Sequence, residues 1–410
     1  MIILESSPFA FLLAAASEDA VRIPLSMLIV FASAKLLAEC LERLKQPGIV
    51  GEILAGVVVG PSVLGWIKPD DLLKALADLG VLFLLFRVGL DVKPSEFLKL
   101  GRTAIVVATF GVIVPMAMGW WIVAWWGHSR IEAIFVGAAM VATSVGITAQ
   151  VLAANGWLNQ RASRIILAAA VIDDVLGLLV LASVSAMARG HVNVWALVLT
   201  GGLAIGFVVV IAVWGNPTMG KVIPRVQEEM HVGEAEFVLS MVLLFGLSVL
   251  ALYAGVAAIV GAFFAGMALS GRVGPRVHDL THGATELLVP FFLAGIGLHV
   301  DLAVFGSRET IVLGILILVA AVISKLAGCG LSAYKLGKAE AFRIGAGMVP
   351  RGEVGMVVAQ IGLGIGVVSQ NIYGVVVFMA AATTLVAPAL LRIAFRGVSE
   401  KAPEEPSQAG

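Results

Sequence analysis

A long succession of apolar segments, each about 20 residues long, constrains this chain more than any single motif. A helix of roughly 20 apolar residues is long enough to cross the hydrocarbon core of a membrane. Composition agrees, because 60% of the 410 residues are hydrophobic and 13% are charged, against about 45–50% and about 25% in soluble domains. The sequence therefore predicts an all-α polytopic membrane protein, with residues 1–410 forming a single transmembrane unit.

Breaks rich in charge, glycine or proline divide the chain into about thirteen such segments. The predicted spans are 22–44, 47–66, 72–92, 102–126, 131–155, 161–186, 192–214, 233–254, 255–271, 283–300, 308–334, 340–367 and 370–394. Lys and Arg concentrate in the loops on one side, which predicts an outside N-terminus and a cytoplasmic C-terminus. The first residues, with Glu5 and no basic start, are interpreted as a short leader to the first span, and 397–410 as a polar cytoplasmic tail.

Several classes of function are disfavoured by the residues that the chain lacks or scatters. The formal net charge is zero, so nothing indicates nucleic-acid binding. Cys40 and Cys329 both lie in apolar runs, which argues against a disulfide scaffold. The six histidines form no pattern of metal ligands, and we expect no bound cofactor.

The chain also repeats itself. "VLFLLFRVGLDV" at 81–92 is half identical to "VPFFLAGIGLHV" at 289–300, which follows 208 residues later. "GEILAG" at 51–56 matches "GAFFAG" at 261–266 at an offset of 210. The repeat unit is therefore six spans, with 192–214 left over as a linker helix, and this odd span turns the second copy upside down. Inverted six-helix repeats are typical of transporters that bind their substrate near the midplane.

Two adjacent carboxylates, Asp173 and Asp174, lie about 12 residues into the span 161–186, close to the middle of the membrane. Neighbouring side chains on a helix point about 100° apart, so the pair can serve two different partners. The second copy carries Ala381 and Ala382 at the corresponding positions, so the scaffold itself does not need these acids. An ionisable residue at this depth indicates a functional site, and we expect an ion or proton role.

The spans 131–155 and 340–367 precede this position in the two copies, and "VGAAMV" at 136–141 matches "IGAGMV" at 344–349 at the offset of 208. Both spans carry helix-breaking residues at mid-depth. Unwound backbone is tolerated there only where it is buried in protein or lines a watery cavity. The sequence therefore predicts two discontinuous helices.

The residues at these two breaks have alternative interpretations. Thr143 and Ser144 fit ion coordination and close helix packing equally well. Arg351 and Glu353, which follow Pro350, fit the neutralisation of helix-end partial charges, as a structural ion pair, better than direct transport.

Two lysines lie well inside the predicted spans, away from their ends. Lys325 is in mid-span, where a cation requires a carboxylate, and either Asp173 or Asp174 is the natural partner. Lys35, with Glu39 one turn away, fits local pairing or snorkelling better.

Five motifs together resemble those of the monovalent cation:proton antiporters: "GEILAGVVVGPSVLG", "VATSVGITA", "VIDDVLGLLVLA", "LVPFFLAGIGLHVDL" and "GMVPRGEVG". The Asp-Asp pair is similar to that of the electrogenic two-aspartate branch. The resemblance implies thirteen helices, two crossing discontinuous helices and a homodimer in a prokaryotic inner membrane. It also implies a dimerisation or scaffold domain (22–92 and 233–300) beside a mobile core ion-transport domain (102–186 and 308–394).

The resemblance also assigns roles within the site. Asp174 would be the essential ion-binding carboxylate, and Asp173 beside it would pair with Lys325. Potassium-efflux relatives typically carry Gln before a single Asp, and this chain has Asp173 there, which favours Na⁺ or Li⁺.

The resulting prediction is a secondary active antiporter, and not an enzyme, that exchanges Na⁺ or Li⁺ for H⁺ and serves pH homeostasis. Carboxylate, hydroxyl and freed carbonyl oxygens are hard ligands that suit Na⁺, and protons compete for the same oxygens. If Lys325 releases Asp173 when the cation binds, two protons exchange for one cation, and transport is electrogenic.

Other functions remain as alternatives. The main one is a K⁺/H⁺ antiporter on the same fold, followed by a sodium-coupled organic anion symporter on a related inverted-repeat fold. A channel suits a closed charge cluster at mid-depth less well than alternating access does. An intramembrane aspartyl protease needs two aspartates that face each other from separate helices, and the adjacent pair on one helix is badly placed for that.

Overall fold

The computed structural model describes residues 18–44, 46–92, 94–188, 194–229, 234–300 and 307–398, and these contain helices and connections but no β-strand. The predicted all-α class is therefore confirmed for the described part. The leader at 1–17 and the tail at 399–410 lie outside the described residues. In chain order the helices are α2 (Glu18–Arg43), α3 (Gly48–Val59), α4 (Asp71–Leu90), α5 (Pro94–Trp125), α6 (Arg130–Ala139), α7 (Val145–Ala154), α8 (Arg161–Ala188), α9 (Val194–Glu229), α10 (Ala235–Tyr253), α11 (Ala258–Leu269), α12 (Pro275–Leu298), α13 (Arg308–Ser332), the 3₁₀ turn η2 (Tyr334–Leu336), α14 (Lys338–Gly347), α15 (Glu353–Gly364) and α16 (Gln370–Ala394).

Every predicted span contains one of these helices, except the two predicted to be discontinuous, which contain two each. Eight helices of the described part are long and apolar enough to cross a membrane: α2, α5, α8, α9, α10, α12, α13 and α16. Four shorter apolar helices, α3, α7, α11 and α15, accompany them. Because α4 carries four charged residues and the short helices do not span alone, the number of thirteen crossings stays a prediction.

Three helices extend well beyond their predicted apolar stretches, by eight residues or more. Helix α5 begins at Pro94 rather than 102, α12 begins at Pro275 rather than 283, and α9 continues to Glu229 rather than ending at 214. The physical reason is that a helix, once formed, gains one backbone hydrogen bond for each residue added, in polar surroundings as well as in hydrocarbon. Hydropathy therefore located the apolar part of each helix and not its ends.

Several helices begin at side-chain caps that the sequence encodes locally. The carboxylate of Asp70 accepts a hydrogen bond from the backbone N–H of Leu73 at the start of α4, at 2.9 Å. Ser129 caps α6 in the same way, and Ser307 caps α13. Each cap satisfies one of the N–H groups that the first turn of a helix leaves unpaired.

The internal repeat is visible as matching close crossings between helices. A methyl group at Gly56 of α3 would overlap the carbonyl oxygen of Ala294 in α12, and one at Gly266 of α11 would overlap that of Phe86 in α4. Gly266 and Phe86 are the repeat counterparts of Gly56 and Ala294. The glycine of each copy therefore contacts the same carbonyl position in the other copy. Such reciprocal contacts are those of a two-fold relation, and glycine permits the close approach of the backbones.

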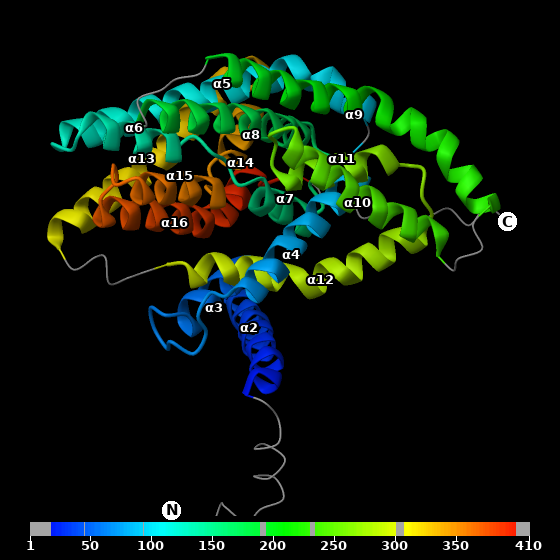
Figure 1. Cartoon of the computed structure of the whole chain (residues 1–410), viewed down its shortest axis with the longest axis horizontal. Helices are drawn as coiled ribbons and strands as arrows, with labels where there is room; N and C mark the ends of the chain where they lie inside the picture. Colours follow the sequence, from blue (N-terminus) through cyan, green and yellow to red (C-terminus); the bar gives the residue numbers. More distant parts are fainter. Residues whose placement is uncertain are drawn as a thin grey trace, which may run out of the picture.

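The helices pack mainly in two groups (Figure 1). Helices α2–α4 pack with α10–α12, and α5–α8 pack with α13–α16. The groups meet chiefly where α4 contacts α7 and α3 contacts α16, and α9 contacts helices of both groups. We call them the scaffold group and the core group. The division into a scaffold domain and a mobile core domain, which the resemblance implies, stays a prediction, as do the roles of the two groups in transport.

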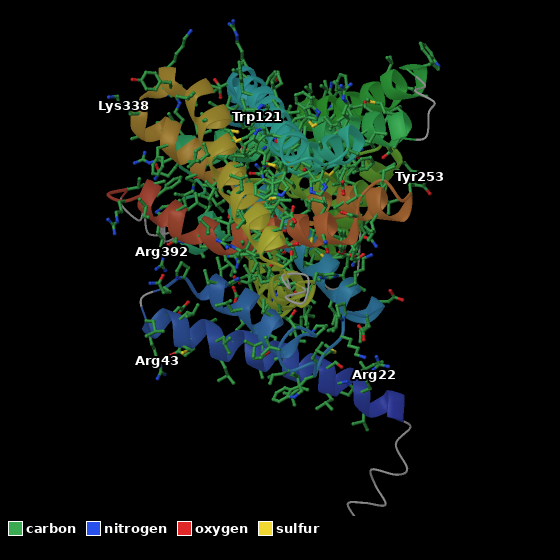
Figure 2. The ribbon with its side chains drawn as sticks, turned by 90° about the vertical axis from the view of Figure 1, so that its left-hand side faces the viewer. Arg22, Arg43, Trp121, Tyr253, Lys338 and Arg392 are labelled. Atoms are coloured by element: carbon green, nitrogen blue, oxygen red, sulfur yellow. The ribbon has the colours of Figure 1, made fainter. Side chains whose placement is uncertain are left out.

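Three charged residues near helix ends, which the predicted topology assigns to one membrane face, lie on one side of the molecule. Figure 2 shows Arg43, Lys338 and Arg392 at one side, and Arg22 and Tyr253 at the opposite side. This separation agrees with the alternation of the spans. Which of the two faces is cytoplasmic stays a prediction.

Candidate ion-binding site

Both predicted interruptions occur, and the two broken helices cross each other there. The first break separates α6 from α7 and the second separates α14 from α15. The backbone N–H of Ser144 donates to the carbonyl of Pro350 at 2.8 Å. A side chain at Gly352 would collide with Ser144, so the two breaks touch through small residues.

Arg351 occupies the crossing as a permanent internal cation. Its side chain is fully buried, and its guanidinium donates to the carbonyls of Val141 and Ala142 in the first break, at 3.2 and 3.4 Å. It also donates to the carbonyl of Ala321 in α13, at 3.1 Å. The carbonyls of Val141 and Ala142 follow the C-terminal end of α6, where aligned peptide dipoles leave partial negative charge. Arg351 thus neutralises a helix end; the side chain of its predicted partner Glu353 lies outside the described residues.

The end of the other broken helix is satisfied by a hydroxyl instead. Thr148 of α7 donates its hydroxyl to the carbonyl of Gly347, the last residue of α14, at 2.7 Å. The backbone N–H of Arg351 donates to the hydroxyl of Thr383 in α16, at 3.1 Å. The crossing is therefore held by hydrogen bonds from four different helices.

Asp173 forms an ion pair with Lys325 in the core group. The ammonium nitrogen lies 3.2 and 3.3 Å from the two carboxylate oxygens, and both side chains are completely buried. This is the pairing that the resemblance implied. The sequence did not single out Gly111 of α5, where a methyl group would press against Cys329 and Lys325. Its only signal was a glycine within an apolar helical stretch, and such glycines are common wherever membrane helices pack closely.

Lys35 provides a correction. Its ammonium group lies 2.9 Å from Glu52 of α3 and 3.8 Å from Glu286 of α12, whereas Glu39 pairs with Arg43. Pairing with Glu39 one turn away was therefore the wrong expectation. Local spacing could not reveal partners on two other helices.

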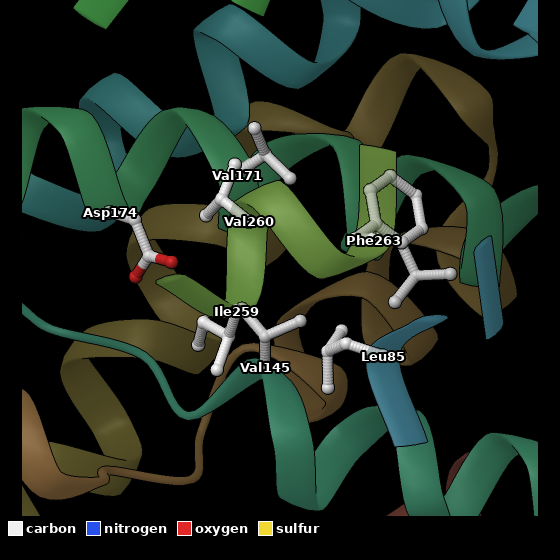
Figure 3. A pocket seen from close by; sticks show the side chains of 8 residues that line it. Leu85, Val145, Val171, Asp174, Ile259, Val260 and Phe263 are labelled. Carbon is white, nitrogen blue, oxygen red and sulfur yellow. The ribbon is translucent and has the colours of Figure 1, made fainter. Parts of the chain in front are cut away.

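Asp174, the next residue along α8, lies between two small cavities. It is 6% exposed and lines both of them. Figure 3 shows it projecting from α8 towards Ile259 and Val145. Its different surroundings from Asp173 follow from the angle between neighbouring positions on a helix.

One of these cavities, the polar cavity, extends to the crossing. Asp174 shares the lining of this cavity with Thr143 and Ser144 of the first break and with Gly352 of the second. The hydroxyl of Thr143 is buried and has no hydrogen-bond partner within the described residues. The remaining lining residues are Val81, Val145, Gly146, Ile259, Phe292 and Val354.

The other cavity, the apolar cavity, extends along α8 towards Arg161. Besides Asp174 it is lined entirely by hydrocarbon side chains: Leu85, Val145, Leu167, Val171, Ile259, Val260 and Phe263. Asp174 thus has oxygen-bearing neighbours on one side and none on the other. A carboxylate beside hydroxyl groups and unwound backbone is a set of hard oxygen donors, which suits a small cation or a proton.

Comparisons with known proteins agree on one family. The family described as "Sodium/hydrogen exchanger, transmembrane" matches residues 27–397 of the chain. The Na⁺/H⁺-K⁺ antiporter GerN of Bacillus cereus is 32% identical, over 91% of this chain and 96% of the relative. The high-affinity Na⁺/H⁺ antiporter NhaS3 of Synechocystis sp. is 31% identical, over 93% of this chain and 92% of the relative.

A solved structure shares the fold. The sodium proton antiporter MjNhaP1 of Methanocaldococcus jannaschii superposes with a TM-score of 0.62 and 16% sequence identity, and the match covers 93% of this chain and 98% of that one. At this identity the likeness concerns the arrangement of the helices alone.

Proposed function

The chain belongs to the sodium/hydrogen exchanger family of membrane transporters, and from this premise we propose that it exchanges Na⁺ or Li⁺ for H⁺ by alternating access at Asp174. The observation that carries the proposal is the position of Asp174, which is buried at the crossing of two broken helices beside the hydroxyls of Thr143 and Ser144. Such a site offers one negative charge and several neutral oxygens to a cation that has lost its water.

Exchange follows from competition for the same carboxylate. A proton on Asp174 removes the charge that attracts the cation, and a bound cation occupies the oxygens that the proton needs. Binding from either side therefore displaces the other ion, provided that the site opens to one side at a time. The scaffold and core groups meet at α4 and α7, next to the site, so sliding of one group against the other would change its access.

The ion pair of Asp173 with Lys325 supplies the second proton of the proposed stoichiometry. If cation binding separates the pair, Lys325 gives up its proton while Asp174 gives up another, and two protons exchange for one cation. Transport would then carry net charge. Measurement of the reversal potential in proteoliposomes tests this, and electroneutral exchange would disprove it.

The second candidate is K⁺/H⁺ exchange on the same fold. One relative that is 32% identical is named a Na⁺/H⁺-K⁺ antiporter, while another that is 31% identical is named a high-affinity Na⁺/H⁺ antiporter. The Asp173–Asp174 pair favours Na⁺ or Li⁺. Proton flux driven by Li⁺, Na⁺ and K⁺ in the same vesicles separates the two.

We also propose an assembly and a location. A homodimer through the scaffold group fits the exposed apolar face of α2, which includes Leu25, Leu28 and Leu36. We place the protein in a prokaryotic inner membrane, surrounded by lipid, with the N-terminus outside and a role in pH homeostasis.

The decisive experiment measures cation-dependent proton flux in proteoliposomes for the native chain and for Asp174→Asn. We expect the variant to fall to the level of protein-free vesicles, because the amide cannot exchange a proton for a cation. Asp78→Asn is the matched control, since Asp78 is an acid in α4 that lines neither cavity. Undiminished flux in Asp174→Asn would overturn the assignment of the site.

A further inference from the structure

The two cavities beside Asp174 differ in what they can hold. Each is only about large enough for a single water molecule. A buried water requires about two to four polar partners. In the polar cavity Asp174, Thr143 and Ser144 can provide them. In the apolar cavity Asp174 is the one polar side chain, so water and hydrated ions are excluded there.

The apolar cavity lies where the two helix groups meet. Leu167 and Val171 belong to α8 of the core group and precede Asp174 by about two turns and one turn. The facing side chains, Leu85 of α4 and Phe263 of α11, belong to the scaffold group. All these side chains are at most 3% exposed. Hydrocarbon side chains from both groups therefore close the path that would lead to Asp174 from the Arg161 end of α8.

Phe263 is the largest of these side chains, and its backbone is held in place. A methyl group at Gly89 of α4 would overlap the carbonyl oxygen of Phe263, so α11 rests directly on α4 at this residue. The next residue, Phe264, is equally buried. Its ring packs against Phe207 of α9 and, in a T-shaped contact, against the Phe263 ring, and it does not line the cavity. The chain thus offers two adjacent phenylalanines, of which one alone faces the site.

We infer that Phe263, together with Leu85 and Val171, forms a hydrophobic gate that closes the Arg161 side of the ion site. A constriction lined by hydrocarbon blocks ions by excluding water, without needing to close completely. While the gate is shut, Asp174 exchanges ions through the polar cavity only. Opening requires the core group to carry Val171 away from Phe263. The inference rests on the proposed function, because it takes Asp174 as the transport site.

Accessibility of a thiol at the gate tests this. In a Cys40→Ser background, which retains the buried Cys329, Val171→Cys is introduced and the protein is reconstituted in proteoliposomes. The rate of modification by a charged, membrane-impermeant methanethiosulfonate is measured from each side. We expect slow modification in this parent, and an increase of about tenfold or more from one side when Phe263→Ser is added, because a hydroxyl wets the cavity.

Three controls make the outcome specific. Phe264→Ser should leave the rate unchanged, and Phe263→Leu should stay close to the parent because the wall remains apolar. Leu85→Ser should accelerate modification as Phe263→Ser does, which covers the case in which one serine variant fails to fold. Equal rates in Phe263→Ser, Leu85→Ser and the parent would overturn the gate, as would equal acceleration by Phe264→Ser.

Failure of the gate and failure of the proposed function give different results. The thiol measurement needs no transport, so accelerated modification without cation-dependent proton flux in the native chain would keep the gate and reject antiport. Normal flux with unchanged modification would keep antiport and reject the gate.

Discussion

The two helix breaks occupy equivalent positions in the two copies of the repeat, but one carries a positive charge and the other carries an uncharged hydroxyl. At the offset of 208 residues, Thr143 of the first break corresponds to Arg351 of the second. Arg351 is a fully buried cation whose guanidinium donates to carbonyls of the first break and of α13. Thr143 carries a small hydroxyl that has no partner within the described residues and borders a cavity. One copy thus has a built-in cation where the other leaves room for one.

The helices that come after the broken helix in each copy, α8 and α16, also differ. In α8 the first copy has Asp173 and Asp174, and in α16 the second has Ala381 and Ala382. The carboxylates therefore lie in the copy whose break lacks a fixed charge. Under the proposed function, the second copy holds the crossing together and the first copy exchanges the ions. Each of the following predictions changes one side of this comparison.

The largest effect is expected from Arg351→Met, which removes the fixed cation. Three carbonyls lose their donor inside the membrane, and we expect a loss of about 3–5 kcal/mol in the free energy of unfolding. The measurement is thermal denaturation in detergent, together with the yield of monodisperse protein. Arg343→Met is the control, because Arg343 lies near the end of the core group and is 18% exposed. A melting temperature equal to that of the control would show that the second break does not depend on its charge.

A smaller effect is expected from separating the ion pair of the first copy. Asp173→Asn leaves Lys325 buried without its counter-charge, which costs about 3 kcal/mol in unfolding free energy. Adding Lys325→Met should restore most of this stability, because no buried charge then remains unpaired. The double variant should also exchange one proton fewer per cation, seen as a changed reversal potential. If the two substitutions destabilise additively, the pair is not coupled and its proposed role in stoichiometry fails.

The sequence predicted the site better where the signal was local. Proline and glycine indicated both breaks. Two adjacent acids in an apolar span indicated that Asp173 and Asp174 belong to a functional site. Lys325 was recognised as needing a carboxylate because an unpaired charge at that depth is costly. The repeat also indicated which residues of the two copies are equivalent.

What the sequence did not predict depends on contacts between distant segments. Two of the acceptors of Arg351 are backbone carbonyls 209 and 210 residues away, and the third is 30 residues away; carbonyls carry no sequence signal. The partners of Lys35 lie on two other helices, while a plausible local partner was at hand. Gly111 matters because two side chains of α13 approach it. Polar extensions of α9 and α12 were missed because hydropathy does not report where helices end.

The smallest effect is expected from Thr143→Val, which tests whether the open hydroxyl contributes to cation binding. Valine has nearly the same shape, so one oxygen ligand is lost while the packing is kept. We expect the apparent affinity for the cation to fall about fivefold, corresponding to about 1 kcal/mol, with no loss of stability, because the removed hydroxyl has no protein partner among the described residues. The measurement is the cation concentration that gives half-maximal proton flux, alongside thermal denaturation of the same sample.

Thr148→Val is the matched control for that variant. Its hydroxyl donates to the carbonyl of Gly347 at the end of α14 and lines neither cavity. This substitution should therefore lower the free energy of unfolding by about 1–2 kcal/mol and leave the apparent cation affinity unchanged. The two threonines lie less than two helical turns apart in sequence, so opposite outcomes would separate binding from support of the crossing. If Thr143→Val instead lowered stability and kept the affinity, the open position in the first copy would be structural, and the contrast with Arg351 would not extend to ion binding.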